Sequence, residues 1–278
     1  MALPYFPIDD TDFKITMGLQ ALREAPWMEI DENYKSDTAL KNDLLTHKRS
    51  SVLAALDQSL DAQARVLKLI EKEFSDHYPR YEPAAPRPDN SPLATAASMV
   101  QEDLVLMQRI EGKIILSAAC VCFPSGWNLI DKMGLEMQDI HMPVPGLNDR
   151  IGKSIDRFLE KLVPGKIVQR FNWGLFDDPA LHQPEGHRIS RVAQPNITHD
   201  NVGEHIFFRV EKQTLQRLPT SDDILFTIRI FNTPLKEIAS DPIKTAHLSH
   251  TLQTMPDAML KYKSVSQYEA LIFDYLNI

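Results

Sequence analysis

Apolar residues recur at helical spacing in two early segments of the chain, which predicts two amphipathic helices after an irregular opening that runs through Trp27. The first helix is expected to begin at Ser36 or Asp37, because either side chain can cap it. The second helix has the clearer pattern and is expected to end near His77. Its apolar positions are Leu56, Leu60, Leu67, Ile70 and Phe74.

Prolines concentrate in residues 78–92, directly after the second predicted helix. Proline has no backbone N–H and fixes its own φ, so such a run neither continues a helix nor pairs in a sheet. We therefore predict an extended connector and place a boundary at its end. The prolines are Pro79, Pro83, Pro86, Pro88 and Pro92.

Beyond the connector, the pattern becomes that of a sheet. Leu104–Met107 and Lys113–Phe123 are mostly apolar and flank Glu111-Gly112, a combination that predicts a hairpin. Three later segments also read as strands, and the last two alternate apolar and polar residues, as half-buried strands do. These segments are Ile167–Phe176, His205–Leu215 and Ile224–Phe231.

Helical patterns occupy the remaining segments. A loop-rich stretch with short helices is expected between residues 124 and 146. A longer helix should follow it, capped by Asn148 or Asp149 and stopped by Pro164-Gly165. The chain from Pro242 onward is predicted to be helical as well.

This order of elements (two strands, short helices, one long helix, three strands) is that of a PAS domain. The predicted fold class is α+β: a PAS-like five-stranded antiparallel sheet with helices on one face, plus N- and C-terminal helical extensions. The expected division is an N-terminal extension and linker at 1–92, a core at 93–240 and a C-terminal segment at 241–278. Because PAS domains hold ligands between sheet and helices, chemistry is expected in the core.

Composition narrows the function. The formal net charge of −8 and pI near 5.6 argue against a nucleic-acid partner, because phosphate binding needs a concentrated basic surface. No apolar stretch approaches the roughly 18–20 residues of a membrane helix, and Met1–Asp12 does not resemble a signal peptide. With Cys120 and Cys122 as the only cysteines, we expect a reducing, cytoplasmic location.

The familiar nucleotide and hydrolase motifs are missing from the sequence. It contains no GxGxxG, GxxxxGK[ST], HExxH, CxxC or GxSxG. These absences disfavour nucleotide-dependent dehydrogenases, kinases and the common hydrolases. Any redox chemistry is therefore expected to take its electrons from another protein.

The last two predicted strands carry a row of polar residues that we expect to share one side of the sheet. They are Arg209, Glu211, Gln213, Thr227 and Arg229. One interpretation is a solvated face with cross-strand pairs, each contributing about 0.2–1 kcal/mol. The other is the wall of a ligand cavity, where the exclusion of water strengthens every charge interaction.

Histidines offer candidate metal ligands. His141 is held in Ile140-His141-Met142-Pro143-Val144-Pro145-Gly146, a stiff turn that would orient its ring in advance. The alternative is a hydrogen-bonded structural histidine. His182 and His187 fit no strong zinc motif. Cys120 or Cys122 could supply a thiolate, although their pattern favours two small buried side chains.

Several segments resemble blocks of one family, the haem-dependent oxidative N-demethylases, long catalogued as a domain of unknown function. The resemblance spans roughly Pro4 to Tyr262. A departure occurs at Lys212, where relatives more often carry arginine, so charge is kept but bidentate geometry is not. The similar segments are Phe13–Leu19 with Trp27 and Asp31–Tyr34, Cys122–Trp127, Ile140–Gly146, Gln169–Trp173, Val210–Pro219 and Phe226–Arg229.

The resemblance implies a haem b in a PAS fold that activates O₂ and removes a methyl group from a small secondary amine such as dimethylamine. Formaldehyde and a primary amine would be released, and NADPH would supply electrons through a flavin and iron–sulfur reductase partner. No membrane partner is implied. The alternatives are a PAS sensor that binds haem or a small molecule without turnover, and a haem-free scaffold.

The resemblance also implies roles for individual residues. His141 is the expected iron ligand, because PAS haem proteins place theirs on the helical side. An arginine near iron can donate to bound oxygen, and a carboxylate can hold a protonated amine or relay protons. The expected catalytic residues are Glu211, Arg229 and Arg170, and the expected cofactor-binding residues are His141, Asn172, Gln213 and Arg217.

Overall fold

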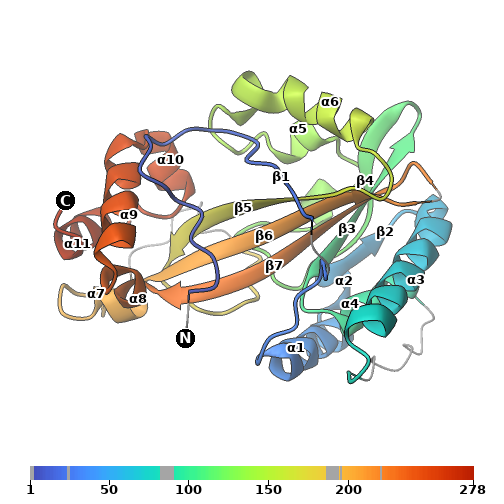
Figure 1. The fold of residues 1–278 in the computed structure, drawn as a ribbon, viewed down its shortest axis with the longest axis horizontal. Helices are drawn as coiled ribbons and strands as arrows, with labels where there is room; N and C mark the ends of the chain where they lie inside the picture. The colour runs from blue at the N-terminus through green and yellow to red at the C-terminus, as the bar shows by residue number, and fades with distance from the viewer. Residues whose placement is uncertain (1–2, 24–25, 82–90, 186–193, 195, 220) are drawn as a thin grey trace.

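The computed structural model describes residues 3–23, 26–81, 91–185, 194, 196–219 and 221–278. In these residues one antiparallel sheet forms the centre of the molecule, and helices pack on both of its faces (Figure 1). The α+β class predicted from the sequence is therefore confirmed. No helix in the described part of the chain combines the length and apolar character that crossing a membrane requires.

The sheet has seven strands in the order β1-β5-β6-β7-β3-β4-β2. All five predicted strands are present, and the prediction of five was wrong because two short strands are added at the outer edges. Two or three residues are too few to show an alternating pattern. The strands are β1 (Gln20–Ala21), β2 (Leu53–Ala55), β3 (Asp103–Ile110), β4 (Lys113–Cys120), β5 (Ile167–Phe176), β6 (Phe207–Arg217) and β7 (Ile224–Pro234).

The two early helices are present. The first begins at Tyr34, with Asn33 at its N-cap position, so the prediction that Ser36 or Asp37 caps it was wrong. The second ends at His77 as expected. Its buried side differs from the prediction, because Leu60 is 58% exposed while Ala62 and Val66 are buried. The helices are α1 (Tyr34–His47), α2 (Arg49–Val52), α3 (Leu60–His77), α4 (Pro92–Met99), α5 (Met137–Ile140), α6 (Lys153–Lys161), α7 (Val202–His205), α8 (Leu235–Ala239), α9 (Pro242–Thr254), α10 (Asp257–Tyr262) and α11 (Glu269–Tyr275).

Two helical segments depart from the expected pattern. α4 was missed: it begins at Pro92, and the Ser91 hydroxyl accepts a hydrogen bond from the N–H of Ala94 (3.3 Å), so a proline we assigned to the connector is the first helical residue. Most of that connector, residues 82–90, lies outside the described residues. The long helix predicted from Asn148 is a wide π-type turn, Asn148–Gly152, which runs on into α6.

Turns and pairing register position the strands. Glu111 and Gly112 both have positive φ, as tight hairpin turns require, and they join β3 to β4. In the β6–β7 hairpin Glu211 lies opposite Ile230, and Lys212 lies opposite Arg229. Directly opposed residues share a face of the sheet, so this register decides which side chains can act together.

The two faces of the sheet carry different helices. We call the face that packs against α6 the cavity face, and the face that packs against α3 and α4 the extension face (Figure 1). Val105 and Leu215 lie on the cavity face, whereas Leu104 and Leu225 lie on the extension face. The C-terminal helices pack around Trp173, near the end of β5 and the beginning of β6. The division of the chain at residues 92 and 240 stays a prediction.

Candidate functional site

A cavity of about 820 Å³ lies between the cavity face of the sheet, the α5–α6 region and the N-terminal segment. Ligand sites typically measure about 300–1,000 Å³ and are mostly apolar with a few placed polar groups. This cavity has that character. Its apolar lining includes Val105, Met107, Leu116, Ile151, Ile155 and Phe158.

His141 forms the helical wall, in the turn that follows α5. Its Nδ1 lies 2.9 Å from the carbonyl oxygen of Met137. Because a carbonyl only accepts, Nδ1 carries the proton of the neutral ring and Nε2 keeps its lone pair. Burial lowers the pKa of His141, which favours this neutral form. Neutral histidines that ligate metals have this arrangement, with the second ring nitrogen fixed by a backbone carbonyl.

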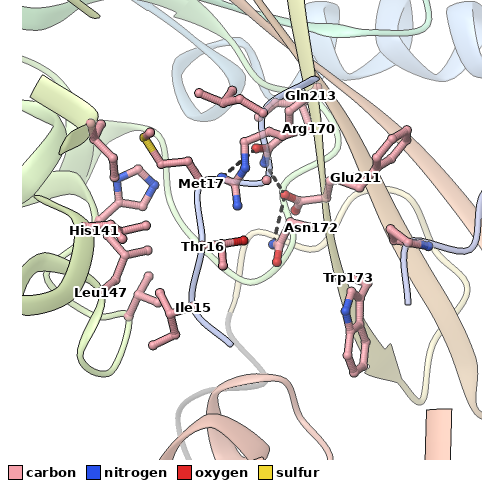
Figure 2. Close-up of a pocket in the computed structure, with 18 of the residues that line it drawn as sticks. Ile15, Thr16, Met17, His141, Leu147, Arg170, Asn172, Trp173, Glu211 and Gln213 are labelled. Carbon is pink, nitrogen blue, oxygen red and sulfur yellow. Dashed lines mark hydrogen bonds between the residues drawn. The ribbon is translucent and has the colours of Figure 1, made fainter. Parts of the chain in front are cut away.

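The opposite wall is a row of polar side chains from β5 and β6 (Figure 2). Asn172 Nδ2 and Gln213 Nε2 both donate to the same oxygen of Glu211, Oε2, at 3.3 Å and 2.8 Å. Arg170 Nη1 donates to Gln213 Oε1 at 3.1 Å. Oε1 of Glu211 has no hydrogen-bond partner among the described residues. The wall thus presents one carboxylate oxygen that can still accept a donor.

Arg170 adds an unused donor to this wall. Its Nε is buried and has no hydrogen-bond partner in the described part of the chain. A buried N–H without a partner costs free energy, roughly 1–3 kcal/mol, so it indicates a group that a bound molecule would satisfy. Four predicted site residues (Arg170, Asn172, Glu211 and Gln213) therefore come together across the cavity from His141, as Figure 2 shows.

Sequence reasoning missed the N-terminal segment as part of the site. It was expected only to be irregular, yet nearly every residue from Tyr5 to Gln20 lines the cavity. Thr16 and Met17 lie between His141 and the sheet wall in Figure 2. The one signal in the sequence was the family-like stretch Phe13–Leu19, which carries no charged pair or metal motif.

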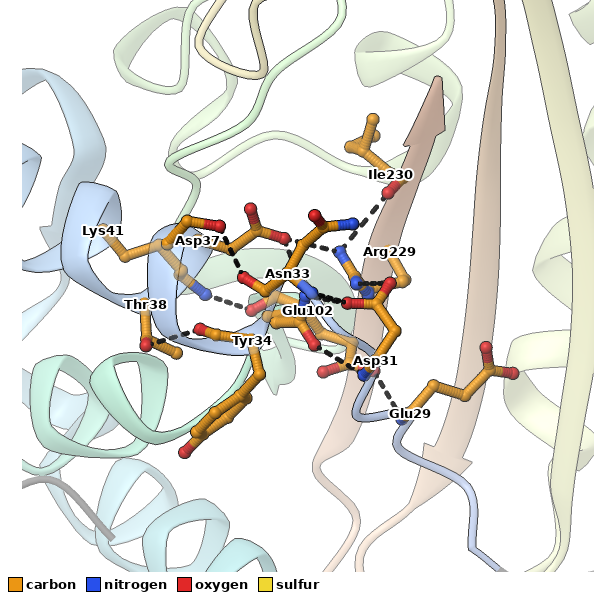
Figure 3. Close-up of polar contacts among 12 residues, drawn as sticks. Glu29, Asp31, Asn33, Tyr34, Asp37, Thr38, Lys41, Glu102, Arg229 and Ile230 are labelled. Atoms are coloured by element: carbon orange, nitrogen blue, oxygen red, sulfur yellow. Dashed lines mark hydrogen bonds and ion pairs between the residues drawn. The ribbon is translucent and has the colours of Figure 1, made fainter. Parts of the chain in front are cut away.

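Arg229 lies on the other face of the sheet. The prediction that Thr227 and Arg229 share a side with Glu211 was wrong, because the register turns them toward the extension face. Arg229 donates to Asp31 Oδ2 at 2.7 Å and to Asp37 Oδ2 at 3.2 Å (Figure 3). It does not line the cavity, so its catalytic role remains an untested prediction that this placement does not favour.

Lys212, the departure from the family pattern, lies on the same side as Arg229. It forms an ion pair with Glu29, and its ammonium group sits 5.5 Å from the ring centroid of Tyr5. Its ammonium group pairs with one carboxylate oxygen, a contact that needs no bidentate geometry. The departure therefore leaves the cavity wall unchanged.

Arg217 is likewise occupied elsewhere. Its Nε and Nη2 donate to the carbonyl oxygens of Leu162 and Leu159, both at 2.7 Å. These carbonyls belong to the end of α6, where a helix leaves acceptors unpaired. Arg217 is not among the cavity residues. The geometry indicates a helix-capping role, and the cofactor-binding role predicted for it stays untested.

Other candidate ligands have structural partners or lie outside the described residues. His182 Nδ1 lies 2.8 Å from the carbonyl of Cys122, and His187 falls outside the described range. Cys120 and Cys122 are free and buried. The described residues hold no group of three or more His, Cys, Asp or Glu side chains that could bind a metal ion.

A buried ion pair joins α1 to the start of β3. Lys41 Nζ is 3.8 Å from Asp103 Oδ1, and both side chains are fully buried. Asp103 also accepts hydrogen bonds from the backbone N–H groups of Cys122 and Phe123, each at 2.8 Å. Burial raises the pKa of Asp103 to about 6 against these contacts.

Asp103 should make the stability of the protein depend on pH. Its folded-state pKa lies above the ordinary 3.8, so its contribution is full below about pH 4 and is lost as pH rises through about 6. At about 1.4 kcal/mol per pKa unit, the free energy of unfolding should fall by about 3 kcal/mol across this range. Urea unfolding of wild type and Asp103→Asn at several pH values measures it. A difference between the two that does not change with pH would contradict this assignment.

The sequence was compared with models of known protein families. Residues 18–273 match the family described as haem-dependent oxidative N-demethylase, alpha subunit-like. The match covers most of the chain and includes β1 to β7, His141 and all four polar residues of the sheet wall.

Proposed function

The chain belongs to the haem-dependent oxidative N-demethylase alpha-subunit-like family, and from this premise we propose that it binds haem in the large cavity and demethylates a small secondary amine there. His141 would ligate the iron, and the sheet wall would face the substrate. One observation carries the proposal. His141 offers an imidazole lone pair on one wall of the cavity, and on the opposite wall Arg170 Nε has no hydrogen-bond partner in the described residues, while Glu211 accepts hydrogen bonds at only one of its two oxygens.

The residues of the cavity fit a haem. Its volume of about 820 Å³ is of the order required, and the apolar walls suit a porphyrin. The neutral His141 supplies one nitrogen ligand with its other ring nitrogen already fixed. We take the haem to be haem b, since the sequence contains no CxxCH motif for covalent attachment.

Glu211 is proposed to hold the amine. A dialkylammonium ion carries one positive charge and two N–H donors, and Glu211 Oε1 is a carboxylate oxygen without a partner in the described residues. Charge-assisted hydrogen bonds of this kind are the stronger ones. Asn172 and Gln213 hold the other oxygen, so the carboxylate is fixed before the amine arrives.

When bound, the haem would supply O₂ activation at iron. In the overall reaction one oxygen atom of O₂ leaves in formaldehyde and the other in water, while a primary amine is released. The balance requires two electrons and two protons. We propose that NADPH supplies the electrons through a flavin and iron–sulfur partner protein, because the sequence contains no nucleotide-binding motif of its own.

The strand arrangement supports a PAS-like core. The five long strands lie in the order β5-β6-β7-β3-β4. The first of them along the chain, β3, therefore pairs with the last, β7, in the middle of the sheet, and β5 and β4 are the outer two. The helices α5 and α6 lie on the cavity face. We propose that β3 to β7 with these helices form the PAS-like unit, to which the N- and C-terminal segments add walls.

The proposal is tested by haem titration followed by turnover. We expect the purified protein to bind hemin with a Soret band, and to release formaldehyde from dimethylamine when NADPH and a flavin and iron–sulfur reductase are supplied. Glu211→Gln should bind hemin normally but lose the amine-dependent turnover, because a neutral amide no longer pairs with the cation. Hemin binding without any amine-dependent turnover would favour a sensor instead. A protein that never takes up hemin would favour a haem-free scaffold.

A further inference from the structure

The polar wall continues past Asn172 to a residue of the C-terminal region. Lys263 Nζ lies 3.2 Å from Asn172 Oδ1 and 2.5 Å from the backbone oxygen of Trp173. It also sits 4.5 Å from the ring centroid of Trp173. Lys263 is 7% exposed and lines the large cavity. The ammonium group is thus held in a fixed place at the end of the wall.

The backbone of this region is fixed as well. Leu175 N–H donates to the carbonyl oxygen of Lys263 at 3.1 Å, which attaches the C-terminal segment to the outer edge of β5. Gly174 makes this approach possible, because a Cβ at that position would lie 3.3 Å from the same carbonyl oxygen and 2.7 Å from the ring of Phe176. Lys263 therefore reaches Asn172 from a rigid support.

Lysine decides which way the amide of Asn172 points. An amide presents an oxygen acceptor on one side and an NH₂ donor on the other, whereas an ammonium group only donates. The ammonium therefore requires Oδ1 on its own side, and Nδ2 must then face Glu211 Oε2. Arg170 acts in the same way on Gln213 at the other end.

The wall is therefore a symmetric chain of hydrogen bonds centred on the Glu211 carboxylate. On one side Lys263 orients the amide of Asn172, and on the other Arg170 orients the amide of Gln213. We propose that Lys263 is a positioning residue: through Asn172 it keeps Glu211 Oε2 occupied and Oε1 open for a cationic N–H donor. The inference rests on the proposed amine site, but the geometry that it concerns is present without haem or amine.

The first experiment uses haem-free protein. The side-chain amide resonance of Asn172, assigned by its loss in Asn172→Leu, should shift in Lys263→Met, because the lysine no longer fixes the amide. Lys261→Met is the matched control, since Lys261 is exposed two residues away, and it should leave the resonance in place. If Lys263→Met does not fold, Lys263→Gln serves, since its amide can accept as well as donate and so dictates no orientation.

The second experiment measures dimethylammonium binding to the haem-loaded protein. Lys263→Met should weaken binding about tenfold, equivalent to about 1.4 kcal/mol, and should have no further effect in the Asn172→Leu background. Lys263→Met also removes the hydrogen bond to the backbone oxygen of Trp173. The resulting loss of stability should be the same with and without Asn172. Such non-additivity separates action through Asn172 from a general structural effect.

The outcomes separate this inference from the proposed function. An unmoved Asn172 resonance in Lys263→Met, or equal losses of amine binding with and without Asn172, would overturn the positioning role. A wild-type protein that binds neither hemin nor dimethylammonium would instead overturn the proposed function, and the resonance experiment would still decide the role of Lys263.

Discussion

His141→Ala is expected to lower the affinity of the protein for hemin by more than about 100-fold, because even the outer-shell partners of metal-ligating histidines contribute about 10–100-fold. The variant removes the one imidazole in the cavity lining whose Nε2 is free of a described partner. Titration with hemin, followed through the Soret band, measures the change.

The matched control for this variant is His199→Ala. His199 is exposed and bonded to Asp274, so its loss should leave hemin binding unchanged. Free imidazole should restore the spectrum of His141→Ala, because the deleted side chain leaves room for it beside the iron. Normal hemin affinity in His141→Ala would mean that another residue is the ligand.

Lys41→Met is expected to have the largest effect on stability, a loss of about 3–5 kcal/mol, as when one partner of a buried ion pair is removed. The Asp103 carboxyl would lie in the interior without the nearby ammonium, and the carbonyl oxygens of Val100 and Glu102 would lose their donor. Urea unfolding at pH 7 measures the loss. Lys35→Met, at an exposed position of the same helix, is the control.

The cost of Lys41→Met should shrink as pH falls toward about 6, because Lys41 lowers the pKa of Asp103 and the carboxyl of the variant therefore takes up a proton at a higher pH than that of the wild type. This dependence distinguishes loss of the ion pair from loss of packing, which does not vary with pH. A loss at pH 7 that stays below about 1 kcal/mol, the typical value for surface pairs, would show that the pair is not a major source of stability.

Apolar runs beside a turn signal, and alternation in the last two segments, were enough to predict every long strand, and β5 has the predicted bounds. The alternation also assigned Glu211 and Arg229 each to the polar side of its own strand. It could not say whether those sides coincide, because a shift of one residue in register exchanges them. That register, set by the turn after Arg217, put Arg229 on the extension face.

The site was partly predictable for a related reason. His141 and the polar residues of β5 and β6 stood out because their side chains carry recognisable chemistry, and the structure brings them to one cavity. Lys263 did not stand out, since nothing near it in the sequence marks it. Its position depends on the close approach that Gly174 allows, which is a tertiary contact and has no local pattern.

The short strands at the sheet margins have a consequence for solubility. An unpaired strand edge is a template on which another chain can add. β2 covers part of β4, β1 covers the start of β5, and the carbonyl of Lys263 engages β5 near its end. A fragment restricted to β3–β7 would uncover both margins and invite self-association into aggregates. The flanking segments thus protect the sheet from other copies of itself.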